Sequence, residues 1–312
     1  MIFFTLIHIC ADEQSLHNSR TNNFDSQIQL YLACAKQLHY TLREQNLDLV
    51  VLTNDKNYLQ KLNTDDYKIE IIEIAFTLKV PSGIKFYSAH FKLEVFQFLA
   101  LQQHPYVALV DSDMLCVNSL PESLQNIIDL KMPMYYDITD QTAPAYGHHV
   151  IIADKERLIK NKSAGTWAGG EFISGTPAFF HDLSEQVKNI QDQYFSSFSL
   201  FHHQGDEMIT SVAIEKLIIN RKHTILDAGA LSIIGRFWSA HTLHVQKPIK
   251  AYYNHFLLHL PADKVFISKL KKDQLKGKAF FKKYTVYLSK KIYRKLIRNM
   301  LIKFRPTTNS TK

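Results

Sequence analysis

The sequence predicts an α/β protein with a mostly parallel central sheet that is flanked by helices. Short apolar runs alternate with amphipathic stretches over residues 2–117, which is the order expected of strands and crossover helices. No glycine precedes Gly83, so neither a Gly-x-Gly-x-x-Gly turn nor a phosphate-binding P-loop can follow the first strand. With 46% apolar and 21% charged residues, the composition is that of an ordinary globular protein.

The first half of the chain supplies the expected strands in order. Residues 2–9 are expected to form a strand, and residues 10–23 a polar loop at its carboxyl end. Asp12 in this loop is a candidate nucleotide contact, although a solvated loop acid is the simpler interpretation. A helix is predicted over 25–45, and further strands are predicted at 47–55 and 68–76. Right-handed crossovers between such strands place ligands at their carboxyl ends.

The stretch 106–117 is the candidate centre of the site. Its apolar run predicts a strand buried on both faces, and the run leads directly into Asp111-Ser112-Asp113. Carboxylates at i and i+2 project the same way from an extended chain, so both can bind one divalent cation. A solvated Asp-Ser-Asp turn is the alternative. Lys92, near the start of a helix predicted over 86–99, is either a phosphate-binding cation or a surface lysine.

Several later segments add candidate residues. Residues 119–130 are expected to form a loop and a short helix, 133–136 a strand, 139–149 a long polar loop, and 167–176 a glycine-rich strand. Glu171 in that strand belongs to a structural turn or to an acceptor site. Asp206 and Glu207 begin an apolar helix, where they cap the helix or face a substrate. His255 and His259 would share a helix face, and a late histidine would complete the metal site.

The order of these motifs resembles glycosyltransferases of the GT-A fold, and most closely glycosyltransferase family 8, with glycogenin and bacterial lipopolysaccharide galactosyltransferases. The resemblance rests on Phe91-Lys92-Leu93, Val110-Asp111-Ser112-Asp113, Gly169-Gly170, Gly205-Asp206-Glu207 and His255-Phe256-Leu257, and it covers about residues 85–260 and the first strand.

The resemblance implies the roles of the site residues. Asp111, Asp113 and His255 would bind Mn²⁺ or Mg²⁺, which would hold the diphosphate of a nucleotide sugar, with Lys92 on the phosphate side. Gly170, Asp206 and Glu207 would face the donor sugar and the acceptor. Family 8 usually has Asn-x-Gly in place of Gly169-Gly170-Glu171 and Asp-Gln in place of Asp206-Glu207, so the donor sugar and the stereochemical course stay open.

The expected function is therefore metal-dependent transfer of a hexose, with a UDP-sugar favoured as donor and retention favoured over inversion. The acceptor would be a hydroxyl of a glycan or glycolipid in the synthesis of bacterial surface polysaccharide or lipopolysaccharide. Asp206 or Glu207 would stabilise the developing positive charge on the sugar, attack it, or act as general base. The alternative is a catalytically inactive GT-A-like domain that binds lipid or RNA.

Charge divides the chain into an expected GT-A domain at 1–262 and a basic tail at 263–312. Residues 264–312 hold 16 Lys and Arg and one acid, a net charge of +15, whereas residues 1–263 carry −7 of the total of +8. The apolar residues of the tail fall along one helix face, which favours an anionic membrane surface over nucleic acid. This face consists of Phe280, Tyr284, Tyr287, Leu288, Ile292, Leu296, Met300 and Phe304.

The expected localisation is cytoplasmic, on the inner face of the membrane. Three scattered cysteines argue against a disulfide scaffold, and residues 1–9 lack the features of a signal peptide. No apolar run in the sequence approaches the roughly 18 residues that a membrane span needs.

Overall fold

A central sheet of seven strands organises the protein, in the order β3-β2-β1-β4-β7-β6-β8. The computed structural model describes residues 1–11, 23–63 and 67–303, with the backbone alone for 298–303. The predicted α/β class is confirmed. The strands are β1 (Ile2–Leu6), β2 (Asp48–Thr53), β3 (Glu70–Glu73), β4 (Val107–Val110), β6 (Met134–Asp137), β7 (Ala168–Gly175) and β8 (Leu226–Asp227).

Strand direction decides which residues meet at one edge of this sheet. β1 pairs in parallel with β2 and β4, β2 with β3, and β6 with β8, whereas β7 runs antiparallel to both β4 and β6. Strands β1, β4, β6 and β8 therefore all point the same way. Their carboxyl ends share one edge, which is the edge where ligands of such sheets bind.

A smaller sheet extends this edge, with strand order β5-β10-β9. Its strands are β5 (Met114–Cys116), β10 (Leu257–His259) and β9 (Ile234–Arg236). β5 follows β4 after a turn at residues 112–113, so the chain passes from the large sheet directly into the small one. β10 is antiparallel to β5 and parallel to β9.

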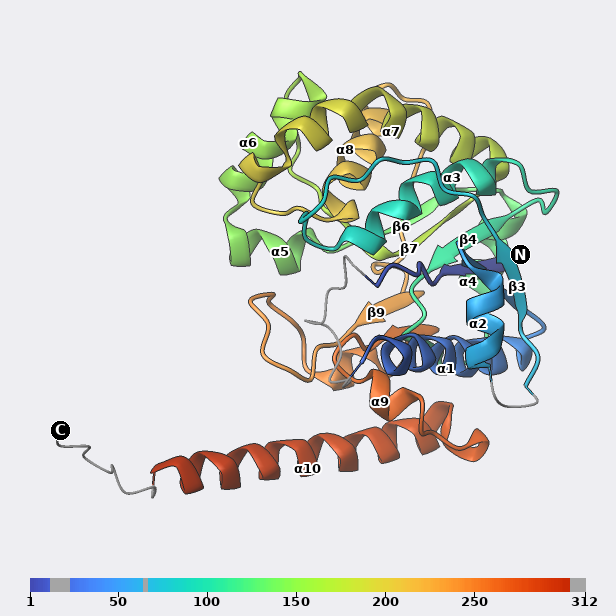
Figure 1. Cartoon of the computed structure of the whole chain (residues 1–312), viewed down its shortest axis with the longest axis vertical. Coiled ribbons are helices and arrows are strands. Elements are labelled where there is room, and N and C mark those ends of the chain that lie inside the picture. Colours follow the sequence, from blue (N-terminus) through green and yellow to red (C-terminus); the bar gives the residue numbers. More distant parts are fainter. Residues whose placement is uncertain (12–22, 64–66, 304–312) are drawn as a thin grey trace.

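Helices cover both faces of the central sheet (Figure 1). α3, α7 and α8 pack together on one face, and α1 packs on β2 and β5 on the other. The helices are α1 (Phe24–Arg43), α2 (Lys56–Leu62), α3 (Lys92–Ala100), α4 (Glu122–Asp129), α5 (Thr139–Tyr146), α6 (His148–Ile159), α7 (Pro177–Ser197), α8 (Asp206–Ile219), α9 (Lys264–Ile267) and α10 (Gly277–Lys303), with single 3₁₀ turns at Tyr87–Phe91, Phe198–Leu200, Ile249–Tyr252 and Lys272–Gln274.

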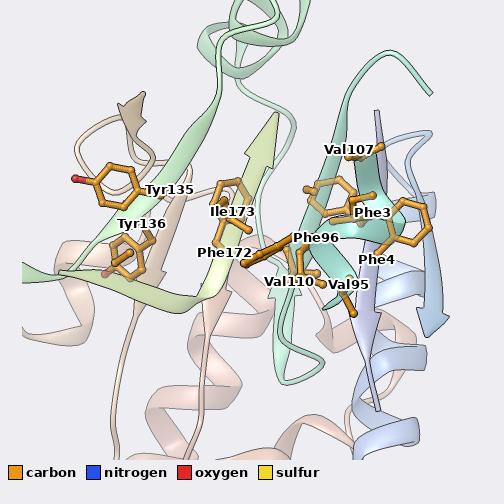
Figure 2. Close-up of a cluster of buried hydrophobic side chains, with 14 of the residues drawn as sticks. Phe3, Phe4, Val95, Phe96, Val107, Val110, Tyr135, Tyr136, Phe172 and Ile173 are labelled. Atoms are coloured by element: carbon orange, nitrogen blue, oxygen red, sulfur yellow. The ribbon is translucent and has the colours of Figure 1, made fainter. Parts of the chain in front are cut away.

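The core lies between these layers and the sheet. Phe3 and Phe4 are adjacent on β1 and point to opposite faces, yet both are buried, because each face carries helices. Figure 2 shows that Phe96 of α3 and Phe172 of β7 lie in the same cluster. Each such fully buried side chain stabilises the fold by about 1.5–3 kcal/mol.

Two predicted elements are wrong. Residues 139–149 form helix α5 and the start of α6, not a polar loop, although Pro144 lies inside α5. The two helices are separated by Gly147, whose φ of 90° stops the first one. Residues 251–259 do not form a helix, because a 3₁₀ turn at Ile249–Tyr252 is followed by strand β10.

The start of the basic segment packs against the body of the protein. Phe280, Phe281 and Tyr284 are buried in a second hydrophobic cluster with residues of α1, β5 and β10. The buried Asp263 carboxylate accepts hydrogen bonds from the Tyr284 hydroxyl at 2.7 Å and from Lys291 Nζ at 2.9 Å, and this anchors the first half of α10. The last turns of α10 extend beyond the body (Figure 1).

Among the described residues, none of the helices has the length and apolar character needed to cross a bilayer.

Candidate active site

Asp111 and Asp113 lie where the chain leaves β4 for the small sheet. The Asp111 amide donates to the Glu171 carbonyl of β7 at 3.1 Å, and the Asp113 carbonyl accepts from the Leu260 amide at 3.1 Å. Backbone contacts to two different sheets therefore fix the turn that carries both carboxylates. Asp113 is 4% exposed, and Asp111 is partly buried.

The pairing of β10 with β5 places His259 beside the two aspartates. β10 pairs with β5 so that His259 lies opposite Met114, next to Asp113. His259 Nε2 is 3.1 Å from Asp113 Oδ1 and 3.8 Å from Asp111 Oδ2. One ligand atom from each of the three residues lies within 4.8 Å of the others. Two carboxylates and one imidazole fit a divalent cation that accepts oxygen and nitrogen ligands, such as Mn²⁺.

His255, which the family resemblance implied as the histidine ligand, is not part of this cluster. Its ring lies 5.3 Å from the Tyr252 ring between centroids, packs against Gly235, and lines a different cavity. The predicted helix would have put residues four apart on one face, but an extended chain separates them by about 13 Å. The structure thus brings His259 to the aspartates in place of His255.

His259 also forms ion pairs with both Asp111 and Asp113. Burial alone would raise the pKa of Asp113 and lower that of His259. Lys264 and His259 outweigh burial and hold the pKa of Asp113 well below its usual range. Asp113 and Glu171 in turn raise the pKa of His259 to about 9. A bound cation would replace the proton on His259 Nε2.

Two lysines neutralise the outer oxygens of the aspartates. Lys92 Nζ lies 2.6 Å from Asp111 Oδ1 and donates to the Gly170 carbonyl at 2.8 Å. Lys264 Nζ lies 2.6 Å from Asp113 Oδ2. Each aspartate therefore directs one oxygen to a lysine and the other to His259. Lys92 was predicted beside the phosphates, whereas Lys264 was counted within the basic tail and missed.

Glu171 and Arg236 form a buried layer behind the cluster. Glu171 Oε1 is 3.4 Å from His259 Nδ1 and 3.4 Å from Arg236 Nε, and Glu171 and Arg236 are 1% and 3% exposed. Arg236 lowers the pKa of Glu171 despite its burial. Glu171 Oε1 and His259 Nδ1 form no hydrogen bond with the described residues, so the Glu171 carboxylate acts on the His259 ring through its charge. Arg236 was not predicted, because a lone arginine in an apolar strand has no distinctive pattern.

Glu207 is held at the amino end of α8. Its Oε2 accepts from Trp167 Nε1 at 2.9 Å and its Oε1 accepts from the Gly170 amide at 3.2 Å, with Arg236 Nη1 at 3.8 Å from Oε1. This carboxylate therefore has a fixed orientation at the edge of the cavity. Its partners are Trp167, which directly precedes β7, Gly170 of β7 and Arg236 of β9.

Asp206, the neighbour of Glu207, faces the lysine side of the site. Its Oδ2 lies 3.5 Å from Lys92 Nζ. Burial raises the pKa of Asp206 to about 7, and Lys92 opposes the shift only in part. Asp206 and Glu207, for which the sequence predicted the same roles, thus have different surroundings.

Gly170 occupies a position where a side chain does not fit. A Cβ there would lie 2.8 Å from Asp206 Oδ2 and 3.3 Å from Glu207 Cγ. Its amide and carbonyl bind Glu207 and Lys92. Glycine at this point allows β7 to approach α8 closely.

These groups face one cavity of about 640 Å³. Its lining includes Asp111, Asp113, His259, Lys92, Lys264, Asp206, Glu207 and Arg236. The remaining candidate, Asp12, lies outside the residues that the structure describes.

Known proteins resemble this chain in structure, whereas no match is found in sequence. No protein-family model and no curated protein sequence matches the chain. WbbM, a bifunctional glycosyltransferase in its apo form, has 10% identity and a TM-score of 0.48, and the match covers 82% of this chain and 45% of WbbM. This chain therefore corresponds to less than half of WbbM.

Two further solved structures match over most of their own length. Mouse xyloside xylosyltransferase 1 in its apo form has 12% identity and a TM-score of 0.44, over 75% of this chain and 87% of the xylosyltransferase. The galactosyltransferase LgtC, in complex with donor and acceptor sugar analogues, has 10% identity and a TM-score of 0.44, over 87% of this chain and 98% of LgtC.

Proposed function

We propose that the protein is a GT-A-type glycosyltransferase that uses a divalent cation to transfer a hexose from a nucleoside diphosphate sugar to a hydroxyl. One observation carries the proposal. A possible cation site, two lysines and the carboxylates of Asp206 and Glu207 line the same cavity at the carboxyl end of a mostly parallel sheet. This combination suits a donor with two negative phosphates beside a sugar that becomes positively charged as it is transferred.

The cation-binding residues in this proposal are Asp111, Asp113 and His259. Mn²⁺ or Mg²⁺ bound there would act as a Lewis acid on the leaving diphosphate. Lys92 and Lys264 neutralise the aspartates now, and their ammonium groups are close enough to the cluster to bind phosphate oxygens when the donor enters. Because no glycine-rich nest follows β1, these side chains must provide most of the positive charge.

Glu207 is the residue that we assign to the donor sugar. Hydrogen bonds from Trp167 and Gly170 orient its carboxylate, so that it can stabilise or attack the anomeric carbon without reorganising. A transfer with retention is therefore our preferred course. Asp206 pairs with Lys92 and is assigned to holding that lysine in place.

The finer assignments complete the proposal. We favour a UDP-sugar as donor and a glycan or glycolipid of bacterial surface polysaccharide or lipopolysaccharide synthesis as acceptor. A panel of UDP- and GDP-sugars, incubated with the full-length protein and Mn²⁺ or Mg²⁺, tests the proposal through release of the nucleoside diphosphate. We expect release from at least one donor and its loss on chelation with EDTA. No release from any donor would contradict the proposed activity.

We also propose that the second half of α10 binds an anionic membrane surface from the cytoplasmic side. Ile292, Tyr293 and Leu296 are 60%, 65% and 54% exposed, and Lys290, Arg294 and Lys295 are exposed around them. Exposed apolar residues among basic ones favour a helix lying in a membrane interface. The first half of the predicted apolar face packs against the body, so the proposal concerns residues after Leu288. The side chains of Met300 and Phe304, also predicted on this face, lie outside the described part of the chain.

A further inference from the structure

A second cavity, of about 800 Å³, lies beside the candidate active site. Asp137 and Asp227, the last residues of β6 and β8, contribute to its lining. β6 and β8 run parallel to each other and in the same direction as β4, so their ends lie at the same edge of the sheet as Asp111. The two cavities are therefore neighbours on the ligand-binding edge.

A partition of hydrogen-bonded residues lies between the two cavities, and their linings have no residue in common. Arg236 lines the first cavity, where its Nη1 lies 3.8 Å from Glu207 Oε1. Its Nη2 donates to Gln141 Oε1 at 3.1 Å, and Gln141 lines the second cavity. Arg236 and Gln141 together thus connect the carboxylate assigned to the donor sugar with the wall of the second cavity.

The lining of the second cavity combines ring surfaces with free polar groups. Tyr136 and Tyr252 contribute aromatic rings. The Asp140 carboxylate and the Lys247 ammonium group are exposed and form no hydrogen bond or ion pair with the described residues. His255 Nδ1 is buried and also lacks a hydrogen-bond partner among them. Cavities of about 300–1,000 Å³ with apolar walls and a few convergent polar groups suit small-molecule ligands.

The charge of the lining selects against a phosphate. Asp137, Asp140 and Asp227 bring three carboxylates to this cavity, and Lys247 is the single lysine among its lining residues. A diphosphate would be repelled, whereas a neutral polyhydroxyl ligand can donate to carboxylates and accept from the lysine and histidine. Aromatic rings add apolar contact area for the carbon faces of such a ligand.

We propose that this second cavity is an acceptor subsite that binds the sugar units of an oligosaccharide beyond the unit carrying the reacting hydroxyl. The inference rests on the proposed glycosyltransferase function and specifies its acceptor: a neutral oligosaccharide that crosses the outer rim of the partition, with its terminal unit near Glu207 and its next units against Tyr136, Tyr252, Asp140 and Lys247. Acceptors of two or more units should therefore bind more tightly than the corresponding monosaccharides.

A glycan array of mono- to tetrasaccharides, probed with the full-length protein, tests this subsite. The test variant is Asp140→Ala/Lys247→Ala, and the matched control is Asp192→Ala/Lys162→Ala, which removes the same charges from exposed positions elsewhere. We expect the wild type to bind a set of oligosaccharides, the test variant to bind them at least about tenfold more weakly, and the control to match the wild type. Equal binding by the test variant, or binding of no oligosaccharide by the wild type, would overturn the proposal.

Donor hydrolysis separates this proposal from the proposed function. The test variant should release nucleoside diphosphate from the donor at the wild-type rate, because neither residue lines the first cavity. If the wild type releases none from any UDP- or GDP-sugar, the glycosyltransferase assignment fails. If the wild type does release nucleoside diphosphate and the array shows no loss of binding for the test variant, the subsite alone fails.

Discussion

His259 Nε2 lies 3.1 Å from Asp113 Oδ1 although 146 positions of sequence separate the two residues. The contact exists because β10 pairs antiparallel with β5, the strand that follows Asp113 directly. Lys264, five positions after His259, reaches the other oxygen of the same carboxylate. The proposed cation site is therefore completed by the segment that leads into the basic C-terminal helix.

The first prediction concerns the layer behind the cation site. Glu171→Gln should weaken Mn²⁺ binding by about 10- to 100-fold, because the amide no longer supplies the negative charge beside the His259 ring. Electron paramagnetic resonance of free Mn²⁺ in a titration measures this affinity. The exposed Glu122→Gln on α4 serves as control. Unchanged Mn²⁺ affinity in a folded Glu171→Gln protein would show that Glu171 does not support the site.

The second prediction concerns Glu207. Glu207→Gln keeps an oxygen for the Trp167 hydrogen bond but removes the charge, so hexose transfer should fall by about 10²- to 10³-fold. Mn²⁺ affinity should stay at the wild-type value, because Glu207 is not among the three proposed ligands. Steady-state kinetics and the Mn²⁺ titration are to be compared on the same preparation. A variant with the wild-type turnover would exclude Glu207 from the chemistry.

The third prediction is a pH dependence of stability. The folded-state pKa of Asp206 is about 7, above the unfolded value of 3.8. The folded protein therefore binds the proton of the Asp206 carboxyl group more tightly than the unfolded chain does. Wild-type stability should therefore fall relative to Asp206→Asn as the pH rises from about 4 to above 7. The full difference is on the order of 4 kcal/mol. Urea unfolding of both proteins at pH 5 and pH 8 measures about 3 kcal/mol of this difference, because the rest is lost below pH 5. An equal difference at the two pH values would refute the assignment.

The fourth prediction concerns membrane binding by α10. Replacing Lys290, Arg294 and Lys295 by Gln should lower affinity for anionic vesicles by about 100-fold, since each basic residue contributes about 1 kcal/mol. Co-sedimentation with phosphatidylglycerol vesicles at physiological salt provides the measurement. The control replaces exposed lysines of the body, Lys61, Lys131 and Lys162, by Gln. If the wild-type protein does not sediment with the vesicles, the membrane proposal is wrong.

Local patterns in the sequence were sufficient for much of the fold. The apolar runs around β1, β2 and β4 predicted strands because buried parallel strands carry apolar residues on both faces. The same reasoning placed Asp111 and Asp113 at the end of β4, since a dry strand does not tolerate carboxylates in its interior. The polar composition of residues 139–146 predicted a loop, but these residues form α5, in which Gln141 and Thr142 are buried despite the presence of Pro144.

The rest of the site depends on contacts between distant segments. His259 and His255 are equally plausible by spacing, and only the register of β10 on β5 separates them. Arg236 is a lone charge in β9, whose role appears once Glu171 and Glu207 lie beside it. Lys264 begins a basic segment in which nothing local distinguishes it from the surface lysines that follow.

Mn²⁺ titration of the full-length wild type beside His259→Ala and His255→Ala, followed by electron paramagnetic resonance, tests the central claim most directly. The account predicts one tight site in the wild type, loss of at least about 100-fold in affinity in His259→Ala, and wild-type affinity in His255→Ala. Tight binding by His259→Ala, or its loss in His255→Ala, would contradict the proposed cation site.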